Sequence, residues 1–346
     1  MQKKNKVRYA KLIVNPGAGK STAFNKNLQA AVECLKENGI EADVALAKPK
    51  EEATRIARKA VDAGYKVIIA MGGDGTLEAA LRGLVGSKTR LGIIPSGTEN
   101  NIAKSLGIPE KLEDACKLIG ENHVRRLDVG QARVKKGKKF YFFELTAIGL
   151  VAAVYPAAAK LLKGQLSRLK DAAETLIHQD TQSKVSMRFE DDSRVEAATM
   201  LVVVSNTPIF GKNFLVAPNA SLEDGLLDVS VYPNFSKAAL IAYYGAVMNG
   251  GTSDNERVQH YRVHKFELKA REKTDVMADG VMLGKGNVEI KCRAGAIRVI
   301  TPKPSEASNK VAKDKDVAAH LPAPVAPAST EKPDQEKLAV PEKKES

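Results

Sequence analysis

The residues best suited to chemistry form the glycine-rich run 72–76, Gly-Gly-Asp-Gly-Thr, which directly follows an apolar segment. Residues 67–71 predict a buried strand, and residues 77–81 continue at helical spacing. Glycines at such a junction let backbone N–H groups and the positive end of a helix approach phosphate oxygens. Asp74 adds a carboxylate, which is unfavourable beside a phosphate unless a divalent cation lies between them or a substrate group needs orienting. The run therefore predicts a site for nucleotide chemistry.

Two similar junctions occur elsewhere in the first third of the chain. Residues 15–21 read Asn-Pro-Gly-Ala-Gly-Lys-Ser, and residues 94–101 read Ile-Pro-Ser-Gly-Thr-Glu-Asn-Asn; each follows a predicted strand. The first is not a P-loop, because that motif requires a glycine where Val14 stands. Each junction alone could be a plain turn or a helix cap. Three of them after strands of one sheet favour a shared phosphate-binding edge.

Carboxylates also gather in the second half of the chain. Residues 217–228 place Glu223, Asp224 and Asp228 around a turn, and closely spaced oxygens, backbone carbonyls included, suit a hard cation. An ordinary Asp-Gly turn explains the same run. Asp279-Gly280 gives a further carboxylate at a predicted strand end, and it too could be a simple turn.

Alternating strands and helices are expected to position the glycine-rich junctions. Apolar periodicity predicts strands at 9–14, 43–46, 67–71 and 91–94, and helices at 24–38, 50–63, 77–85, 100–107 and 111–119. This alternation predicts an α/β domain with a mostly parallel sheet over residues 1–130. Ligands bind such sheets at the carboxyl ends of the strands, which is the edge that the junctions share.

The chain from residue 124 onward reads mainly as β-structure. A hairpin is predicted from 124–134 and 140–148, and helices are predicted at 156–178 and 237–249. Short strands are predicted at 184–190, 195–205, 226–232, 261–269, 274–278, 287–292 and 296–301. We expect residues 131–302 to form a mainly antiparallel β-sandwich domain. Residues 303–346 hold six of the fifteen prolines and no aromatic residue, which predicts a disordered tail.

Composition narrows the classes of function. The tail has eight Lys and eight Asp plus Glu, so the formal net charge of +13 lies in residues 1–302 and favours a polyanionic partner. Nucleic acid is not expected, because no Lys/Arg runs interleaved with aromatics occur. Three scattered cysteines predict buried, inert thiols in a reducing cytoplasm. His260 and His264 lie four apart in a predicted strand, where a metal site is disfavoured.

The order of these motifs resembles the soluble bacterial diacylglycerol kinase family, which includes relatives of sphingosine and ceramide kinases. The resemblance covers about residues 7–302 and rests on the runs 14–19, 72–76, 97–103, 224–228 and 279–280. The Gly-Gly-Asp-Gly run alone also occurs in NAD kinases and phosphofructokinases, so the order of the whole set carries the specificity.

The resemblance implies ATP-dependent phosphorylation of a lipid hydroxyl, diacylglycerol-like or sphingoid-like, in a cleft between the two domains. It implies that ATP contacts Asn15, Gly72, Gly73, Asp74, Gly75, Thr76, Gly97 and Thr98. It also implies a structural Mg²⁺ held by Asp224 with the carbonyl oxygens of Ser221 and Leu226. Asp279 would be the base that receives the hydroxyl proton, which leaves Asp74 to serve Mg²⁺ or to orient phosphate.

The chain departs from the family pattern at several of these positions. Val281 stands where the family often has Glu after the base, and Ala47 where a threonine is usual. Asn is common where Glu78 and Glu144 stand, and Asp is common where Asn101 stands.

We expect a cytoplasmic enzyme that reaches its lipid at an anionic membrane surface. The basic folded part and the leucine face of helix 156–178 could supply the attraction, although that helix could instead pack on the sandwich. A homodimer is compatible with the sequence. Two other functions remain open: an NAD-kinase-like enzyme with a soluble substrate, and a catalytically weak nucleotide- or lipid-binding regulator suggested by Val281 and Ala47.

Overall fold

A computed structural model describes residues 8–17, 24–49, 51–135, 137–153, 183–210, 214–215, 217–233 and 258–303. The predicted helices at 156–178 and 237–249 lie outside these residues, as does the predicted tail beyond Lys303. Across the ranges that the structure describes, no helix is long and apolar enough to cross a membrane.

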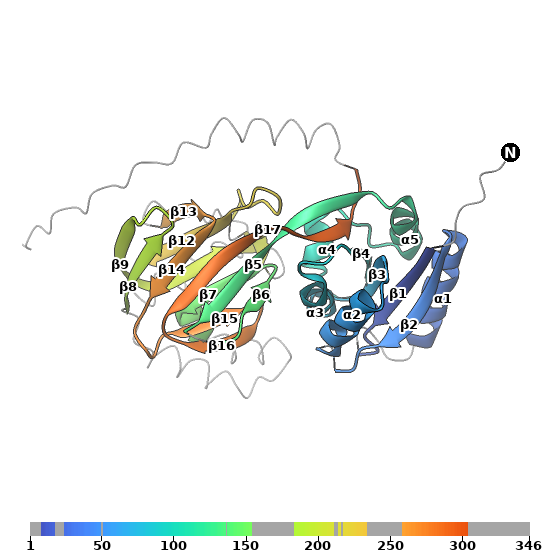
Figure 1. Cartoon of the computed structure of the whole chain (residues 1–346), viewed down its shortest axis with the longest axis horizontal. Helices are drawn as coiled ribbons and strands as arrows, with labels where there is room; N and C mark the ends of the chain where they lie inside the picture. Colours follow the sequence, from blue (N-terminus) through green and yellow to red (C-terminus); the bar gives the residue numbers. More distant parts are fainter. Residues whose placement is uncertain are drawn as a thin grey trace, which may run out of the picture. The chain divides into compact units, whose positions relative to one another are not determined.

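Four parallel strands form the first part of the fold. They are β1 (Arg8–Val14), β2 (Ile40–Leu46), β3 (Val67–Gly72) and β4 (Arg90–Pro95), hydrogen-bonded in the order β2-β1-β3-β4 (Figure 1). Helices accompany them as α1 (Phe24–Glu37), α2 (Glu52–Asp62), α3 (Asp74–Leu84), α4 (Asn101–Ser105) and α5 (Leu112–Glu121). All six residues of β3 are buried, as its continuous apolar run requires of a strand covered on both faces. The predicted parallel α/β sheet is confirmed.

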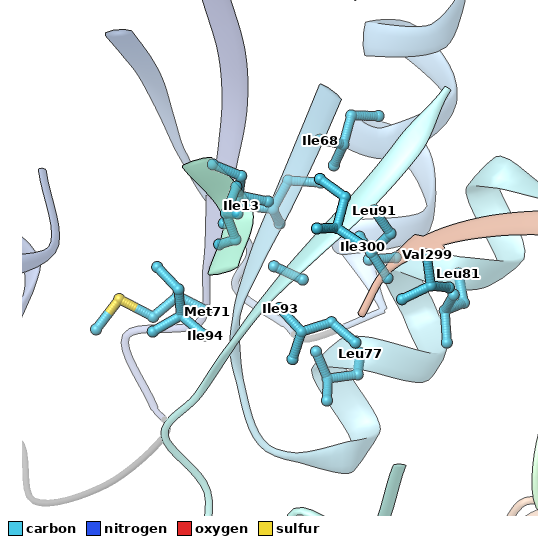
Figure 2. Packing of buried hydrophobic residues seen from close by; sticks show 14 of the residues in the cluster. Ile13, Ile68, Met71, Leu77, Leu81, Leu91, Ile93, Ile94, Val299 and Ile300 are labelled. Carbon is cyan, nitrogen blue, oxygen red and sulfur yellow. The ribbon is translucent and has the colours of Figure 1, made fainter. Parts of the chain in front are cut away.

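The core of this part packs α3 against the central strands. Figure 2 shows Leu77 and Leu81 of α3 beside Ile93 of β4 and Val299, all members of one buried apolar cluster. Val299 and Ile300 come from the last strand of the described chain, so the carboxyl end of the fold completes the core of its amino-terminal part.

Antiparallel strands form the second part. They are β5 (Val124–Val134), β6 (Phe140–Phe142), β7 (Leu145–Gly149), β8 (Ser183–Phe189), β9 (Arg194–Ser205), β12 (Leu227–Pro233), β13 (Gln259–Val263), β14 (Lys265–Lys269), β15 (Asp275–Ala278), β16 (Val281–Lys285) and β17 (Val288–Ile300). A small separate pair contains β10 (Ile209–Phe210) and β11 (Phe214–Leu215). These strands pair antiparallel with one another, which confirms the predicted β-rich carboxyl-terminal part.

Strand β17 runs through both parts of the fold. It pairs antiparallel with β5 along most of its length, and Arg298 and Val299 pair parallel with β4. Its register with β5 shifts between Arg293 and Ile297, where Gly295 adopts a left-handed φ of 53°. The two strands predicted at 287–292 and 296–301 are therefore one strand with a bulge, because the irregular residues do not interrupt its direction.

Several other predicted boundaries were wrong. The strand predicted at 140–148 breaks at residues 143–144, where the backbone N–H groups turn toward a side chain instead of a neighbouring strand. The strand predicted at 261–269 breaks at His264, whose side chain bonds Gly225. Helix α3 begins at Asp74 and not at residue 77, because Gly73 supplies the extended residue that precedes a helix. Strand β16 was missed, since it is short, mostly exposed and contains Gly284.

Candidate active site

The three glycine-rich junctions meet at the carboxyl ends of β1, β3 and β4. Asn15 Nδ2 donates to Thr76 Oγ1 at 3.3 Å, which ties the first junction to the second. Ser96 N donates to the carbonyl oxygen of Gly72 at 3.0 Å, which ties the third to the second. The convergence inferred from three strand ends is thus present in the structure.

Glycine is required where the second and third junctions touch. A Cβ atom on Gly97 would lie 2.4 Å from the Cα of Gly73, and one on Gly73 would lie 3.0 Å from the Cα of Gly97. Real Cβ atoms essentially never approach closer than 3.0 Å, so the contact excludes a side chain at Gly97, and a side chain at Gly73 would fit only if its neighbour shifted. This contact places the start of α3 beside residues 97–98.

Asp74 connects the glycine-rich run to the next helix. Its Oδ1 accepts a hydrogen bond from the backbone N–H of Ile102 at 3.1 Å, in the first turn of α4. Asp74 therefore caps a neighbouring helix, and its half-buried carboxylate stands at the edge where the three junctions meet.

Asp279 lies in a cradle built by the break between β6 and β7. Its Oδ2 accepts from Phe143 N at 2.8 Å, and its Oδ1 accepts from Glu144 N at 3.1 Å and Leu145 N at 3.2 Å. Its side chain has 0% exposure, and its φ of 42° is left-handed. A non-glycine residue in that region is uncommon and indicates that the surroundings hold it there.

Arg82 on α3 joins the two parts of the fold at this carboxylate. Its guanidinium lies 3.2 Å from Asp279 Oδ2 and 3.2 Å from Glu78 Oε2. Arg82 Nε donates to the carbonyl oxygen of Tyr141 at 2.9 Å, and the guanidinium carbon lies 4.5 Å from the centre of the Phe140 ring. One side chain thus bonds its own helix and the residues around the β6–β7 break.

Glu144 is an acid of the site whose pKa is strongly perturbed. Burial, together with the negative charges of Asp279, Glu78 and Asp74, raises the pKa of Glu144 to about 9. Its Oε1 is buried and has no hydrogen-bond partner among the residues that the structure describes. Glu144 is therefore protonated at neutral pH.

Burial also raises the pKa of Asp279, while Arg82 and the three backbone N–H groups act in the opposite direction. A carboxylate has about four lone-pair sites, and four donors already fill those of Asp279. A substrate hydroxyl can reach this carboxylate only by taking the place of one donor. Arg82 is the only side chain among the four.

The sequence-predicted residues thus lie in two groups. The sheet-edge residues surround Gly73 and Gly97, and Asp279 lies across from α3, where the acids Asp74, Glu78 and Glu144 act on one another electrostatically. The sequence did not predict the role of Arg82, because an arginine in a helix carries no local signal of a partner nearly two hundred residues away. Glu144 had been noted only as a departure from the family pattern.

The turn at 221–226 is fixed by charges from neighbouring strands. Asp224 Oδ1 accepts from Leu226 N at 2.9 Å, and its Oδ2 bonds the guanidinium of Arg262. The buried carboxylate of Asp128 accepts from Gly225 N at 2.6 Å and from Gly295 N at 2.7 Å, and burial raises its pKa. Asp128 therefore links this turn to the bulge of β17.

This turn offers oxygen ligands for a cation, but the carboxylate of Asp224 already accepts hydrogen bonds from Leu226 and Arg262. Within the described ranges, no three His, Cys, Asp or Glu side chains are grouped so that they could hold a metal ion. A cation held by Asp224 would need backbone carbonyls and water as its other ligands, and it would compete with Arg262 for the carboxylate. His260 and His264 have separate partners, Ser230 Oγ and the Gly225 carbonyl oxygen, both at 3.1 Å.

Known structures place this fold in a class. A crystal structure of yeast NADH kinase complexed with NADH shares the fold, with a TM-score of 0.53, 9% identity and coverage of 92% of this chain and 90% of that one. At 9% identity, this likeness identifies the class of fold and carries no statement about activity.

The sequence comparisons narrow the class to a family. Residues 9–132 match the diacylglycerol kinase catalytic domain, and residues 147–301 match the YegS C-terminal NAD kinase beta sandwich-like domain. A Pseudomonas aeruginosa protein named "Probable lipid kinase YegS-like" is 30% identical over 81% of this chain and 91% of its own length. The Bacillus subtilis protein named diacylglycerol kinase is 27% identical over 86% of this chain and 97% of its own.

A crystal structure of a diacylglycerol kinase from Bacillus anthracis agrees with these matches. It has a TM-score of 0.68 and 26% identity, and the alignment covers 85% of this chain and 97% of that one. The chain belongs to the diacylglycerol kinase family of lipid kinases, as the order of its motifs indicated.

Proposed function

We propose that this protein transfers the γ-phosphoryl group of ATP to the hydroxyl of a diacylglycerol-like or sphingoid-like lipid at a membrane surface. The observation that carries the proposal is Asp279, a fully buried carboxylate that the β-rich part presents to α3, the helix that begins within the Gly72–Thr76 run. Phosphoryl transfer needs positioning, charge neutralisation and one well-placed base, and this arrangement offers all three.

In the proposed reaction, Asp279 is the base that accepts the hydroxyl proton. The lipid hydroxyl oxygen forms a bond to the γ-phosphorus, the bond from that phosphorus to the ADP oxygen breaks, and the hydroxyl proton passes to an Asp279 oxygen. The hydroxyl enters by replacing Arg82 as the fourth donor to the carboxylate. The displaced guanidinium keeps its bond to Tyr141 and stays close to the developing negative charge.

ATP would be held by the edge that the three junctions form. Asn15, Gly72, Gly73, Asp74, Gly75, Thr76, Gly97 and Thr98 line this edge or lie next to it. The close contact of Gly73 with Gly97 supports the assignment, because side chains there would force the junctions apart. Mg²⁺ would neutralise the phosphate charge near Asp74, whose half-buried carboxylate stands at that edge.

A structural Mg²⁺ at Asp224, Ser221 and Leu226 is a separate part of the proposal. Oxygen-rich turns suit this hard cation, and Asp224 lies beside Asp128 and Glu223. Arg262 now satisfies the carboxylate, so metal and guanidinium compete for the same oxygen.

The test is a kinase assay with a total lipid extract, Mg²⁺ and labelled ATP, with products identified by mass spectrometry. We expect a phosphorylated diacylglycerol or sphingoid lipid, and a loss of about 10²–10⁴-fold in turnover for Asp279→Asn. Asp192→Asn, a change on an exposed turn, is the matched control and should behave as the unaltered protein.

Other outcomes would support the other functions. Label found only in NAD, when NAD is offered in place of lipid, would overturn the lipid assignment in favour of an NAD kinase. Nucleotide binding without turnover of any substrate would favour a regulator. Unchanged turnover in Asp279→Asn would show that another group accepts the proton.

A further inference from the structure

Strand β16 carries exposed apolar side chains at the end of the sheet order. Val281 is 43% exposed and Met282 is 40% exposed, although large apolar residues in the described part of the chain are mostly buried. β16 pairs with β15 and is the terminal strand of the sheet path. Figure 1 shows β15 and β16 side by side. Exposed apolar side chains on a terminal strand indicate a surface that binds a partner.

These side chains directly follow the proposed base. Asp279 and Gly280 form the turn of the β15–β16 hairpin with φ angles of 42° and 71°, and Val281 pairs with Ala278 across it. The left-handed turn fixes the hairpin, so Val281 and Met282 cannot move far from the site without moving Asp279.

The other end of β16 meets a turn rich in lysine. Lys135 N donates to the Asn287 carbonyl oxygen at 2.8 Å, and Val134 Cγ1 lies 3.7 Å from where a Cβ on Gly284 would stand. These contacts bring the turn between β5 and β6 against the end of the hairpin. The exposed cations gathered here are Lys135, Lys138, Lys139 and Lys285.

Acidic groups around this end only partly offset the lysines. Lys285 pairs with Asp275 at 3.3 Å, and Glu272 lies next to Gly286. The loop that carries Glu272 also carries Arg271 and Lys273. The exposed side chains at this end of β16 therefore carry a net positive charge, and the exposed apolar side chains of Val281 and Met282 lie next to them.

We propose that Val281, Met282, Lys135, Lys138, Lys139 and Lys285, here called the β16 surface, dock onto an anionic lipid bilayer. The proposal rests on the function proposed above and names the surface through which that site meets its substrate. Lysines hold an anionic headgroup layer electrostatically, and the two apolar side chains enter the boundary of the acyl chains. A hydroxyl near the headgroup level is then presented to the turn at residues 279–280.

The charge around β16 distinguishes it from the other exposed apolar strand. On β2, Val44 is 38% exposed and Leu46 is 53% exposed, but the charges beside them are mixed. Glu41 and Asp43 are acidic, Asp43 pairs with Lys11, and Lys48 is exposed just beyond Leu46. β2 therefore supplies a control with the same kind of side chain in surroundings of mixed charge.

The experiment is cosedimentation of the full chain with phosphatidylcholine vesicles and with vesicles containing phosphatidylglycerol, at low and high salt. We expect binding to the anionic vesicles only. Lys135→Gln/Lys138→Gln/Lys139→Gln should weaken it by about tenfold or more at low salt and far less at high salt. Val281→Thr/Met282→Thr should weaken it about threefold or more at both salt concentrations.

Two control variants match these changes in number and type. Lys26→Gln/Lys36→Gln/Lys59→Gln removes three exposed helical lysines elsewhere, and Val44→Thr/Leu46→Thr removes the apolar side chains of β2. Both should bind as the unaltered protein does. Equal losses in the test and control variants would overturn the proposal.

A dissolved short-chain diacylglycerol separates this proposal from the function on which it rests. The triple lysine variant should phosphorylate the dissolved substrate at the normal rate and vesicle-borne diacylglycerol at a reduced rate. Equal rates on both forms would overturn the docking surface and leave the lipid kinase assignment standing. No turnover by the unaltered protein, with vesicle binding still dependent on the β16 surface, would overturn the kinase and retain the surface.

Discussion

At the scale of single residues, the site depends on how one buried carboxylate is compensated. Asp279 is surrounded by three backbone N–H groups and Arg82, while Glu144 stands protonated beside it. Burial raises the pKa of both acids, but Arg82 and three backbone N–H groups oppose this rise at Asp279, whereas neighbouring negative charges add to it at Glu144. This difference suits a site with one base that must not be repelled by its neighbours.

Replacing Arg82 should destabilise the fold more than replacing an exposed arginine. Arg82→Gln leaves Asp279 buried without its cation, and breaking a buried ion pair costs about 3–5 kcal/mol. Arg188→Gln, which breaks an exposed pair with Glu267, should cost about 0–1 kcal/mol. The free energy of unfolding in urea measures both. If Arg82→Gln costs no more than Arg188→Gln, Arg82 does not compensate Asp279.

Glu144→Gln should remove a pH dependence from the stability. Because the pKa of Glu144 is raised from 4.5 to about 9, the folded state keeps a proton between these pH values that the unfolded state has lost. The stability of the unaltered protein therefore falls as pH rises through that window, by up to about 1.4 kcal/mol per pH unit. Glutamine cannot ionise, so the variant should gain in Tm over the unaltered protein steadily from pH 5 to pH 9. Glu267→Gln, an exposed change, should show no such trend; a constant difference for Glu144→Gln would mean that Glu144 is ionised at neutral pH.

At the scale of elements, the sequence specified the periodic segments and missed the interruptions. The strands around residues 67–72 and 90–95 and the helices between them follow from apolar periodicity, which depends only on near neighbours. The breaks at residues 143–144 and at His264 depend on partners far along the chain, Asp279 and Gly225. Local patterns hold no information on such bonds. The glycine junctions could be predicted because each is formed by consecutive residues. The cradle of Asp279 could not, because its residues are far apart in the sequence.

Mg²⁺ binding at the turn 221–226 can be tested through the competition between the ion and Arg262 for Asp224. Arg262→Gln frees an oxygen of Asp224, so Mg²⁺ should raise the Tm of this variant more than that of the unaltered protein. Chelation with EDTA should reverse both shifts. Asp224→Asn isolates the turn from any other cation site, because it removes the proposed ligand and leaves Asp74 in place. An equal Mg²⁺-dependent shift in Asp224→Asn would place the ion elsewhere.

At the scale of the whole molecule, two long strands hold the α/β part and the β-rich part together. Leu127, Val129, Ile297 and Val299 lie in the apolar core of the first part, and Ala132, Val134, Val288 and Ile290 lie in the core of the second. All eight residues belong to β5 or β17. Each of these strands therefore enters both cores, and neither core can lose them without exposing apolar surface in the other.

We therefore expect the described residues up to 302 to unfold as one cooperative unit. In native-state hydrogen exchange, the slowest amides of β3 and β9 should report the same opening free energy, although these strands lie in different parts of the fold. Ile69→Val in β3 should lower it by about 0.5–1.5 kcal/mol, and Val229→Ala in β12 should lower it by a comparable or larger amount. Because β5 and β17 couple the cores, each variant should lower protection equally in both parts. Loss of protection confined to the mutated part would show that the long strands separate before the cores unfold, and that the cradle of Asp279 can open without unfolding the three glycine-rich junctions.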